Sequence, residues 1–246
     1  MTRRRWIADE VHGNTAALLG EHALHLTRVL RAEIGQEFDI AVGDTVRRGK
    51  IIEISGDRVE FTLGEEQVIR PTPHLTLALA IFKFDRMEWA IEKCTEIGIA
   101  RIIPVIAHRT DTHLASAAIK RHQRWQRIAL QAAEQSRRAA PPEIAVPVKL
   151  RDLGSAGVSP ARQLEAGARA SRIVLAESED DRLLRDALQG HSGEAVLAVG
   201  PEGGWTDDEL RWFHESGWIA ASLGDTILRA ETAAIVATAI ALDALR

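Results

Sequence analysis

Two short segments near the end of the chain place charged side chains beside glycines. Residues 199–206 read VGPEGGWT and residues 223–233 read LGDTILRAETA, so the segments supply Glu202, Arg229 and Glu231. Paired glycines let the backbone lie at positive φ and approach a ligand closely. Their simpler interpretation is a turn that precedes a helix. The chemistry open to these segments is therefore ligand binding by backbone groups, with the carboxylates of Glu202 and Glu231 and the guanidinium of Arg229 close by.

Short apolar strands lead into both segments. Residues 195–199 and 218–223 are apolar runs of strand length, and each run stops at a glycine. Between them Thr206 and Glu209 form a capping box that starts a helix, which ends near Gly217. Two consecutive strands that end in glycine loops are typical of a ligand crevice at the carboxyl edge of a parallel sheet.

The elements before these segments predict an α/β domain with a mostly parallel sheet. Apolar strands are expected at residues 75–82, 101–107 and 171–176, and Pro104 indicates an edge position or a distorted ladder for the second of them. The expected helices are an amphipathic helix ending at Gly98, a long basic helix at 116–139 ended by Pro141 and Pro142, an acidic helix at 180–189 opened by Ser178, and a uniformly apolar helix at 231–246.

The first 72 residues predict a separate small β domain. Pro71 and Pro73 favour an extended linker, so the second domain spans residues 73–246. His22 and His25 suggest a metal site, but no cysteine or third histidine follows at ligand spacing, so we interpret them as polar helix positions. The expected elements are a helix at residues 22–32 and strands at 37–42, 48–54 and 58–63.

The composition is that of a chain with a full hydrophobic core. It has 246 residues, of which 46% are hydrophobic, enough for one large or two unequal domains. A single cysteine, Cys94, excludes an internal disulfide framework. No run approaches the roughly 20 apolar residues that span a bilayer. We therefore expect a reducing, cytoplasmic setting without membrane insertion.

Charge is strongly segregated along the chain. The net charge of −4 argues against a general nucleic-acid binder. Residues 101–138, however, hold eight Lys or Arg and two acidic residues, whereas residues 139–246 hold ten basic and seventeen acidic residues. The basic stretch can present a face to a polyanion, although a solvated helix face is the commoner cause. Trp125 lies among these arginines, and a helical tryptophan more often packs into a core or interface than stacks on a base.

The glycine segments extend into long, specific motifs. The strings GPEGGWTDDEL and LGDTILRAETAAIVA resemble the two C-terminal motifs of the RsmE family, SPOUT-class methyltransferases that methylate N3 of a uridine in small-subunit (16S) ribosomal RNA. One position departs, because the family usually has an arginine where this chain has Thr226. The resemblance covers most of the chain, since it extends to KFDRMEW at 83–89, KCTEIG at 93–98, IPV at 103–105 and EQSRR at 134–138.

The resemblance implies a fold and a cofactor. The fold is a SPOUT-type knotted, mostly parallel sheet with an N-terminal PUA-like β-barrel that helps to hold RNA. The implied trefoil knot holds S-adenosylmethionine and is an exception to the rule that chains do not thread loops. Ile227 and Leu228 are expected to cover its adenine. The cofactor-binding residues implied are Leu175, Gly200, Pro201, Glu202, Gly203, Leu223, Gly224, Ile227 and Leu228.

The same resemblance suggests catalytic roles. Methylation of uridine N3 needs a donor in line with a nitrogen that loses its proton, and it needs no metal. Arg138 and Arg229 are candidates for stabilising charge on the uridine oxygens, and Glu202 and Glu231 for accepting the proton or binding the amino group of the donor. The simpler roles are a first-turn carboxylate for Glu231 and a loop residue that satisfies backbone N–H groups for Glu202. Arg138 is alternatively a phosphate contact, as expected of Arg121, Arg124 and Arg127.

Other functions share much of this pattern. A ribose 2′-O methyltransferase of SPOUT type would use the same cofactor knot, and a catalytically silent RNA-binding protein would retain the fold. A Rossmann dinucleotide site is not supported, since no G-x-G-x-x-G string opens a helix. The expected partners are small-subunit ribosomal RNA, free or in the assembled subunit, and a second copy of the chain in a homodimer, because the helix at 231–246 is too apolar for a surface element.

Overall fold

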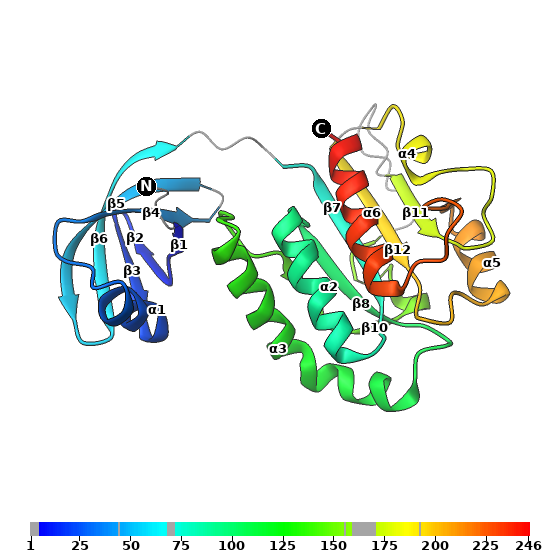
Figure 1. Ribbon diagram of the computed structural model, residues 1–246, viewed down its shortest axis with the longest axis horizontal. Helices are drawn as coiled ribbons and strands as arrows, with labels where there is room; N and C mark the ends of the chain where they lie inside the picture. Colours follow the sequence, from blue (N-terminus) through cyan, green and yellow to red (C-terminus); the bar gives the residue numbers. More distant parts are fainter. Residues whose placement is uncertain (1–4, 44, 68–71, 155, 159–170, 192) are drawn as a thin grey trace. The chain divides into compact units, whose positions relative to one another are not determined.

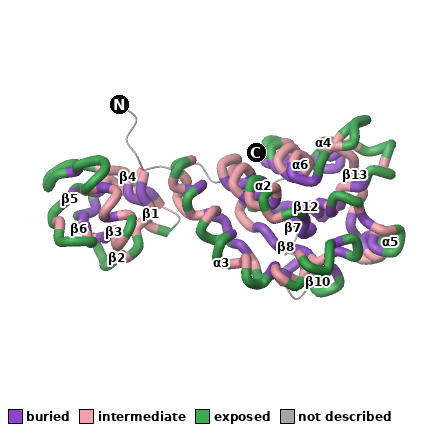
Figure 2. The backbone as a smooth tube through the Cα atoms, turned by 60° about the horizontal axis from the view of Figure 1, so that its bottom comes forward, coloured by how far each residue is buried: buried purple, intermediate pink, exposed green. Residues whose placement is uncertain are grey.

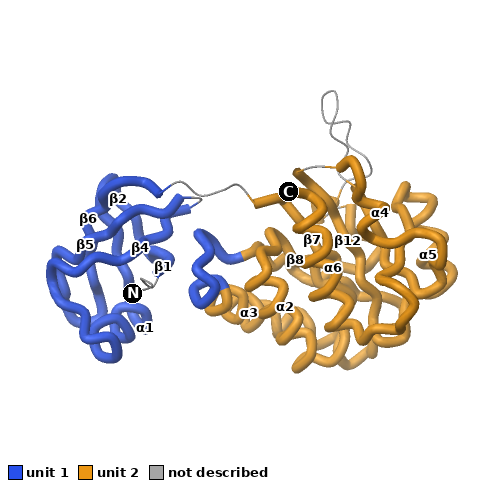
Figure 3. The backbone as a smooth tube through the Cα atoms, turned by 45° about the horizontal axis from the view of Figure 1, so that its top comes forward, with its two compact units in different colours: residues 1–71, 133–141 blue, residues 72–132, 142–246 orange. Residues whose placement is uncertain are grey.

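Two compact units make up the chain in the computed structural model (Figure 3). The structure describes residues 5–43, 45–67, 72–154, 156–158, 171–191 and 193–246. The long helix α3 (Thr112–Gln135) begins in the second unit and ends in the first. The first unit comprises Met1–Pro71 and Ala133–Pro141, and the second comprises Thr72–Ala132 and Pro142–Arg246.

The first unit is built on a curled six-stranded sheet (Figure 1). Its strand order is β1-β4-β5-β6-β3-β2, and every pairing is antiparallel except the parallel pair β1 and β4. The small β domain predicted from the sequence is confirmed, with three strands that the sequence pattern did not indicate. The elements are β1 (Arg5–Ile7), β2 (Glu10–His12), β3 (Thr15–Leu19), α1 (Gly20–Leu24), the π-helical turn η1 (His25–Val29), β4 (Glu37–Val42), β5 (Thr45–Ser55) and β6 (Arg58–Gln67).

Alternate side chains of β6 point into the core of this unit. Val59, Phe61 and Leu63 are buried, and the residues between them are not. Opposite them, Gly49 lies at a register shift of β5, and a Cβ there would come within 2.3 Å of Cγ1 of Ile40. A side chain at this position would collide with Ile40, so glycine suits the point where the pairing of β5 with β6 shifts register.

The second unit is an α/β domain whose described strands all pair in parallel. The strand order is β10-β8-β7-β12-β11-β13, with β9 also paired to β8, so the mostly parallel sheet predicted from the sequence is confirmed. The trefoil knot implied by the resemblance stays a prediction. The elements besides α3 are β7 (His74–Ala80), α2 (Phe84–Ile97), β8 (Arg101–Ile106), β9 (Glu143–Ile144), β10 (Val148–Lys149), the 3-10 turn η2 (Leu150–Asp152), β11 (Ser171–Leu175), α4 (Leu184–Ala187), β12 (Glu194–Val199), α5 (Asp207–Glu215), β13 (Ile219–Ala221) and α6 (Ala230–Ala244).

Helices cover both faces of this sheet, and buried residues follow its central strands (Figure 2). Leu77 and Leu79 of β7 pack in the cluster formed with α2 and α6, whereas Ala78 and Ala80 pack in the opposite cluster with Phe213 of α5. A strand that is buried on both faces needs apolar residues at every position. This requirement accounts for the near absence of polar alternation along β7.

The structure decides between the two alternatives predicted for Pro104, an edge position or a distorted ladder. Strand β8 is not an edge strand, because β7 pairs with it on one side. On its other side, β9 pairs with Arg101 and Ile102, and β10 pairs with Val105 and Ile106. Pro104 falls between these two short partners, where the outer ladder has no pairing, so the distorted-ladder alternative is the one observed.

The basic helix ends earlier than its prolines predicted. α3 ends at Gln135, because the next turn reverses the chain: Arg137 adopts φ 61° and its N–H donates to the Glu134 carbonyl at 3.2 Å. The N–H of Arg138 donates to the Ala133 carbonyl at 2.9 Å, which completes a Schellman motif. Arg138 therefore lies beyond the helix, in its terminating turn, and not on its last turn.

The acidic helix predicted at residues 180–189 is also wrong in extent. Only Leu184–Ala187 is helical, and its N-cap is Leu183 in place of Ser178. The carboxylate of Glu179 accepts the N–H groups of Asp181 and Arg182, both at 3.1 Å, which holds a turn where the helix was expected.

Candidate active site

The carboxyl ends of β7, β8, β12, β11 and β13 lie along one edge of the parallel sheet, and both glycine segments follow strands at this edge. After β12 the chain makes a tight turn in which the N–H of Gly204 donates to the Pro201 carbonyl at 2.8 Å, with Gly204 at φ 68°. A Cβ on Gly200 would come within 3.3 Å of the Trp205 ring. The glycines here are needed for the turn itself and for close packing against Trp205.

Three contacts hold this loop rigidly to its neighbours. The indole N–H of Trp205 donates to the Leu175 carbonyl at the end of β11, at 3.1 Å. The guanidinium of Arg109, in the loop after β8, donates to the carbonyls of Gly203 and Trp205. The predicted capping box is present, and Glu209 also accepts the His108 N–H at 2.7 Å. The sequence reasoning gave Arg109 no such role, because nothing in its pattern joins it to a loop 94 residues away.

The second glycine segment leaves β13 and leads into α6. Ser222 is tied to the loop before α4, since its N–H donates to the Arg182 carbonyl at 2.9 Å. Gly224 adopts φ 119°, which side-chain-bearing residues rarely reach. Ile227 is 81% exposed, an unusual position for a large apolar side chain, and Thr226 is exposed beside it. Such an apolar residue at the rim of the sheet edge suits contact with a flat ring.

Glu202 and Glu231 are brought together by an arginine that the sequence reasoning did not single out. Nη1 of Arg86, in the first turn of α2, lies 3.3 Å from Oε1 of Glu231 and 3.5 Å from Oε1 of Glu202. We call these three residues the edge triad. The sequence signal for Arg86 was its place in the motif KFDRMEW. Arg86 lies 145 residues from Glu231, so the sequence alone did not indicate their contact.

The edge triad has one buried oxygen to spare. Glu231 is 5% exposed, and its Oε2 is buried without a hydrogen-bond partner among the described residues. Such an atom is rare in folded proteins, because a buried oxygen without a donor costs free energy. At formal charges, two carboxylates and one guanidinium leave one negative charge in excess. The triad is therefore suited to a ligand group that is positively charged or donates a hydrogen bond.

The two candidate arginines occupy different surroundings. Arg229 is the exposed N-cap of α6, two residues before Glu231, so it belongs to the sheet edge. Arg138 belongs to the first unit, where burial lowers its pKa to about 10. The guanidinium thus stays charged at neutral pH in a partly desolvated place, where its interaction with an anion is stronger than in water.

The turn that carries Arg138 is fastened within the first unit. The Arg5 guanidinium donates to the Arg137 carbonyl. Nε2 of His22 lies 3.2 Å from Oε1 of Glu134, and its Nδ1 lies 3.2 Å from Oδ2 of Asp9. His22 is a polar position of helix α1, as predicted, and it bridges two carboxylates. These contacts fix the backbone around Arg138 through the β domain.

The basic face of α3 is partly neutralised. Arg124 forms a two-pronged pair with Glu88 of α2, with distances of 2.7 and 2.8 Å, and Arg121 approaches the same carboxylate at 3.3 Å. Trp125 is fully buried in the core beside Phe84, so it is a packing residue and cannot stack on a base.

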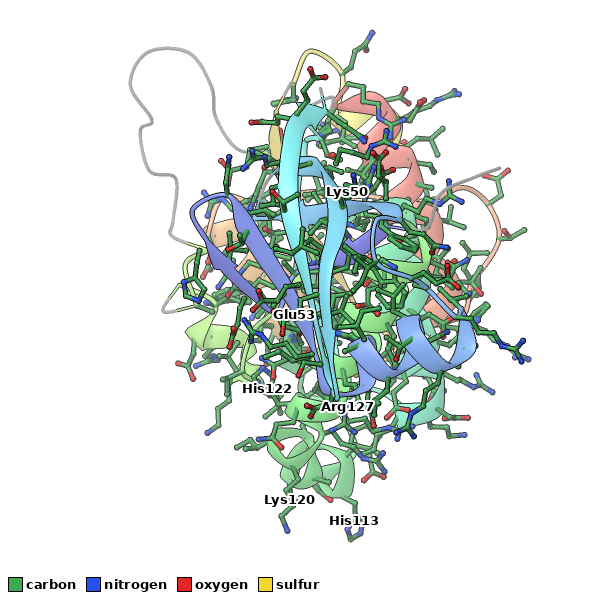
Figure 4. All side chains as sticks on the ribbon, turned by 90° about the vertical axis from the view of Figure 1, so that its left-hand side faces the viewer. Lys50, Glu53, His113, Lys120, His122 and Arg127 are labelled. Atoms are coloured by element: carbon green, nitrogen blue, oxygen red, sulfur yellow. The ribbon has the colours of Figure 1, made fainter. Side chains whose placement is uncertain are left out.

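The outward residues of α3 are the ones left for a polyanion. Lys120 and Arg127 are exposed, and Figure 4 shows Lys120 projecting from the helix. In the part of the chain that the structure describes, no carboxylate forms an ion pair with Arg127. Of the three arginines expected to bind RNA, Arg127 is thus the one with its charge available.

Sequence comparison identifies the class of enzyme. Residues 70–242 match the family described as the RNA methyltransferase domain. The chain belongs to this family. It is 32% identical over 236 residues to the ribosomal RNA small subunit methyltransferase E of Synechocystis sp., with 94% of this chain and 74% of that protein covered. It is 28% identical to the Aquifex aeolicus protein of the same name, with 96% and 97% covered.

Solved structures of family members have the same fold. The ribosomal RNA small subunit methyltransferase E of Neisseria gonorrhoeae, bound to S-adenosyl methionine, superposes with a TM-score of 0.81 at 28% identity, covering 97% of this chain and 96% of that one. A putative methyltransferase of Legionella pneumophila in complex with the same cofactor gives a TM-score of 0.80 at 28% identity, covering 99% and 98%. The chain is therefore an RNA methyltransferase of SPOUT fold, and its curled N-terminal sheet corresponds to the PUA-like domain.

Two further observations concern the described residues only. No helix among them is both long enough and apolar enough to cross a membrane. Within the same residues, no three His, Cys, Asp or Glu side chains are grouped as ligands for a metal ion.

Proposed function

We propose that this protein transfers the methyl group of S-adenosylmethionine to N3 of a uridine in small-subunit (16S) ribosomal RNA. The observation that carries the proposal is the buried Oε2 of Glu231, which has no hydrogen-bond partner within the described part of the chain, beside two glycine loops at the carboxyl edge of the sheet. Relatives that cover nearly the whole chain are named as methyltransferases of this RNA, and two solved neighbours hold this cofactor.

The residues at the edge fit the cofactor. The tight turn at 201–204 and the positive φ of Gly224 shape the two loops at the sheet edge. The exposed Ile227 offers an apolar surface for adenine, and Leu228 follows it. Leu175, Gly200, Leu223 and the neighbouring loop residues named from the sequence complete the set. When bound, the cofactor would supply an electrophilic methyl group for transfer to the deprotonated nitrogen.

Arginines stabilise the negative charge that develops on uridine. When N3 loses its proton, the charge spreads to the two carbonyl oxygens, and a guanidinium fork can donate to such an oxygen more strongly in the transition state than in the ground state. Arg138, charged and partly desolvated, takes this role, and the exposed Arg229 lies at the edge where the methyl donor binds. The exposed residues of α3, Arg127 foremost, hold the RNA phosphates.

The nucleoside product decides among the candidate reactions. RNA from cells with and without this protein is digested, and its methylated nucleosides are mapped by mass. We expect N3-methyluridine at one position of small-subunit RNA to disappear with the protein. A missing ribose-methylated nucleoside would point to a 2′-O methyltransferase, and an unchanged spectrum would point to an RNA-binding protein without activity; either result defeats the proposal.

Replacing Arg138 tests the catalytic assignment. In single-turnover methylation at saturating RNA and cofactor, Arg138→Ala should lower the rate about a hundredfold, roughly 3 kcal/mol, because an oxyanion donor is lost. Arg138→Lys should recover little of it, since a lysine offers a point charge without the fork. Cofactor affinity is the control and stays near that of the parent. Parent rates in both variants would show that Arg138 contacts phosphate only.

The remaining parts of the proposal concern assembly. The β domain, residues 1–72, holds RNA, and the methyltransferase domain, residues 73–246, forms a homodimer through the apolar surface of α6. The substrate is small-subunit RNA or the assembled subunit, and the setting is the cytoplasm. Much of α6 is apolar and only half-buried within one chain, which favours packing against a copy. Light scattering at micromolar concentration should give twice the chain mass.

A further inference from the structure

The edge triad has an excess of negative charge where the proposed cofactor carries an excess of positive charge. S-adenosylmethionine has a sulfonium, an ammonium and a carboxylate, so its net charge is positive. S-adenosylhomocysteine, the product, has lost the sulfonium charge and is neutral overall. A site with an uncompensated carboxylate therefore interacts differently with donor and product.

The geometry of the triad places its excess charge on Glu231. Nη1 of Arg86 approaches the Oε1 atoms of Glu231 and Glu202, at 3.3 and 3.5 Å, and among the residues that the structure describes Oε2 of Glu231 has no hydrogen-bond donor. Glu231 is 5% exposed, whereas the Glu202 side chain is 42% exposed and is screened by water. A buried charge is screened far less than an exposed one.

We propose that the Glu202–Arg86–Glu231 triad is a charge-sensing subsite that makes the enzyme bind S-adenosylmethionine in preference to S-adenosylhomocysteine, with the buried carboxylate of Glu231 supplying the uncompensated negative charge. The inference rests on the proposed function. Arg86 is the positioning residue: it holds both carboxylates by one nitrogen and leaves one oxygen free. Loss of the sulfonium charge on methyl transfer then weakens binding, so the product leaves more readily than the donor.

Calorimetry on the full-length protein separates this role from simpler ones. Three ligands are titrated: S-adenosylmethionine, S-adenosylhomocysteine, and sinefungin, in which an amine-bearing carbon replaces the sulfonium centre. For Glu231→Gln we expect affinity for the two cationic ligands to fall about tenfold or more, and affinity for S-adenosylhomocysteine to change less than threefold. Glu92→Gln is the matched control, because Glu92 is an exposed carboxylate of α2 that pairs with Lys93.

A second variant tests the same inference if Glu231→Gln fails to fold. Glu202 is more exposed, so Glu202→Gln should fold normally, and it leaves Arg86 to neutralise Glu231 alone. The preference for the cationic ligands should again decrease. Equal losses for all three ligands would show that the carboxylates hold the shared amino-acid end, and unchanged affinities would show a structural role; both overturn the inference. If the parent protein binds none of the three, the proposed function itself fails.

Discussion

Helix α2 carries two charge clusters of opposite sign, only two residues apart in the sequence. Arg86 joins two carboxylates at the sheet edge, which leaves an excess of negative charge. Glu88 joins Arg121 and Arg124 of α3, which leaves an excess of positive charge. Residues two apart on a helix point in very different directions, so the clusters do not merge.

Helix α2 therefore contributes to two surfaces that suit ligands of opposite charge. The negative cluster lies at the edge where a cationic methyl donor is proposed to bind, and the positive cluster lies on the helix proposed to bind RNA. The carboxylates Glu231 and Glu88 are both largely buried, with side chains 7% and 13% exposed, but the clusters differ in the exposure of their arginines, which is 33% for Arg86 and 58% for Arg124. Charges in the edge triad should therefore matter more for stability than charges in the cluster around Glu88.

Removing the central arginine should have the largest effect. Arg86→Met keeps a long side chain but leaves Glu231 buried without its cation, which should reduce the free energy of unfolding by about 2 kcal/mol. The double variant Arg86→Met/Glu231→Gln should recover most of this loss, since the buried charge is gone. Arg124→Met is the control, and it should cost less than about 0.5 kcal/mol, because the Arg124 side chain is 58% exposed and Arg121 still pairs with Glu88. Denaturant unfolding measures all three, and a single variant as stable as the parent would contradict the comparison.

Local sequence patterns predicted much of the sheet edge but not the long-range contacts that Arg86 and Arg109 make there. The strand ends, the glycine turns and the capping box at Thr206 depend on neighbours within a few residues, so the sequence sufficed for them. Arg86 and Arg109 act on loops about a hundred residues or more away. Such contacts follow from the order of strands in the sheet, which hydrophobic periodicity does not determine.

The end of α3 is a second feature that the sequence did not predict correctly. Prolines at 141 and 142 suggested the stop, but the helix ends at Gln135 because Arg137 takes up a left-handed conformation that glycine usually provides. Nothing in the residue type of Arg137 predicts this. Contacts of Arg5 and His22 with the same turn provide the compensation, and they come from the other end of the unit's sequence.

Releasing the positive cluster should have an intermediate effect. Glu88→Gln removes the carboxylate that neutralises Arg121 and Arg124, so both guanidiniums become available to phosphates. We expect RNA to bind about fivefold more tightly at low salt, with a salt dependence steeper by about 0.7 to 0.9 in the log–log slope for each guanidinium that gains a phosphate contact. Filter binding across a salt series measures both. Affinity for S-adenosylhomocysteine should not change, and a loss of RNA affinity would mean that Glu88 orders the surface that RNA contacts.

The smallest expected effect distinguishes paired from unpaired arginines on α3. Arg127 has its charge available, so Arg127→Ala should weaken RNA binding about threefold and flatten the salt slope by about 0.7 to 0.9, the value of one phosphate contact. Arg124→Ala should change the slope less, because Glu88 already neutralises that guanidinium at 2.7 and 2.8 Å. In the Glu88→Gln background the difference should disappear, since Arg124 is then as available as Arg127. Equal slopes for the two single variants would show that RNA displaces Glu88 from Arg124. The arginines of the positive cluster would then bind phosphates even though Glu88 pairs with them in the free protein.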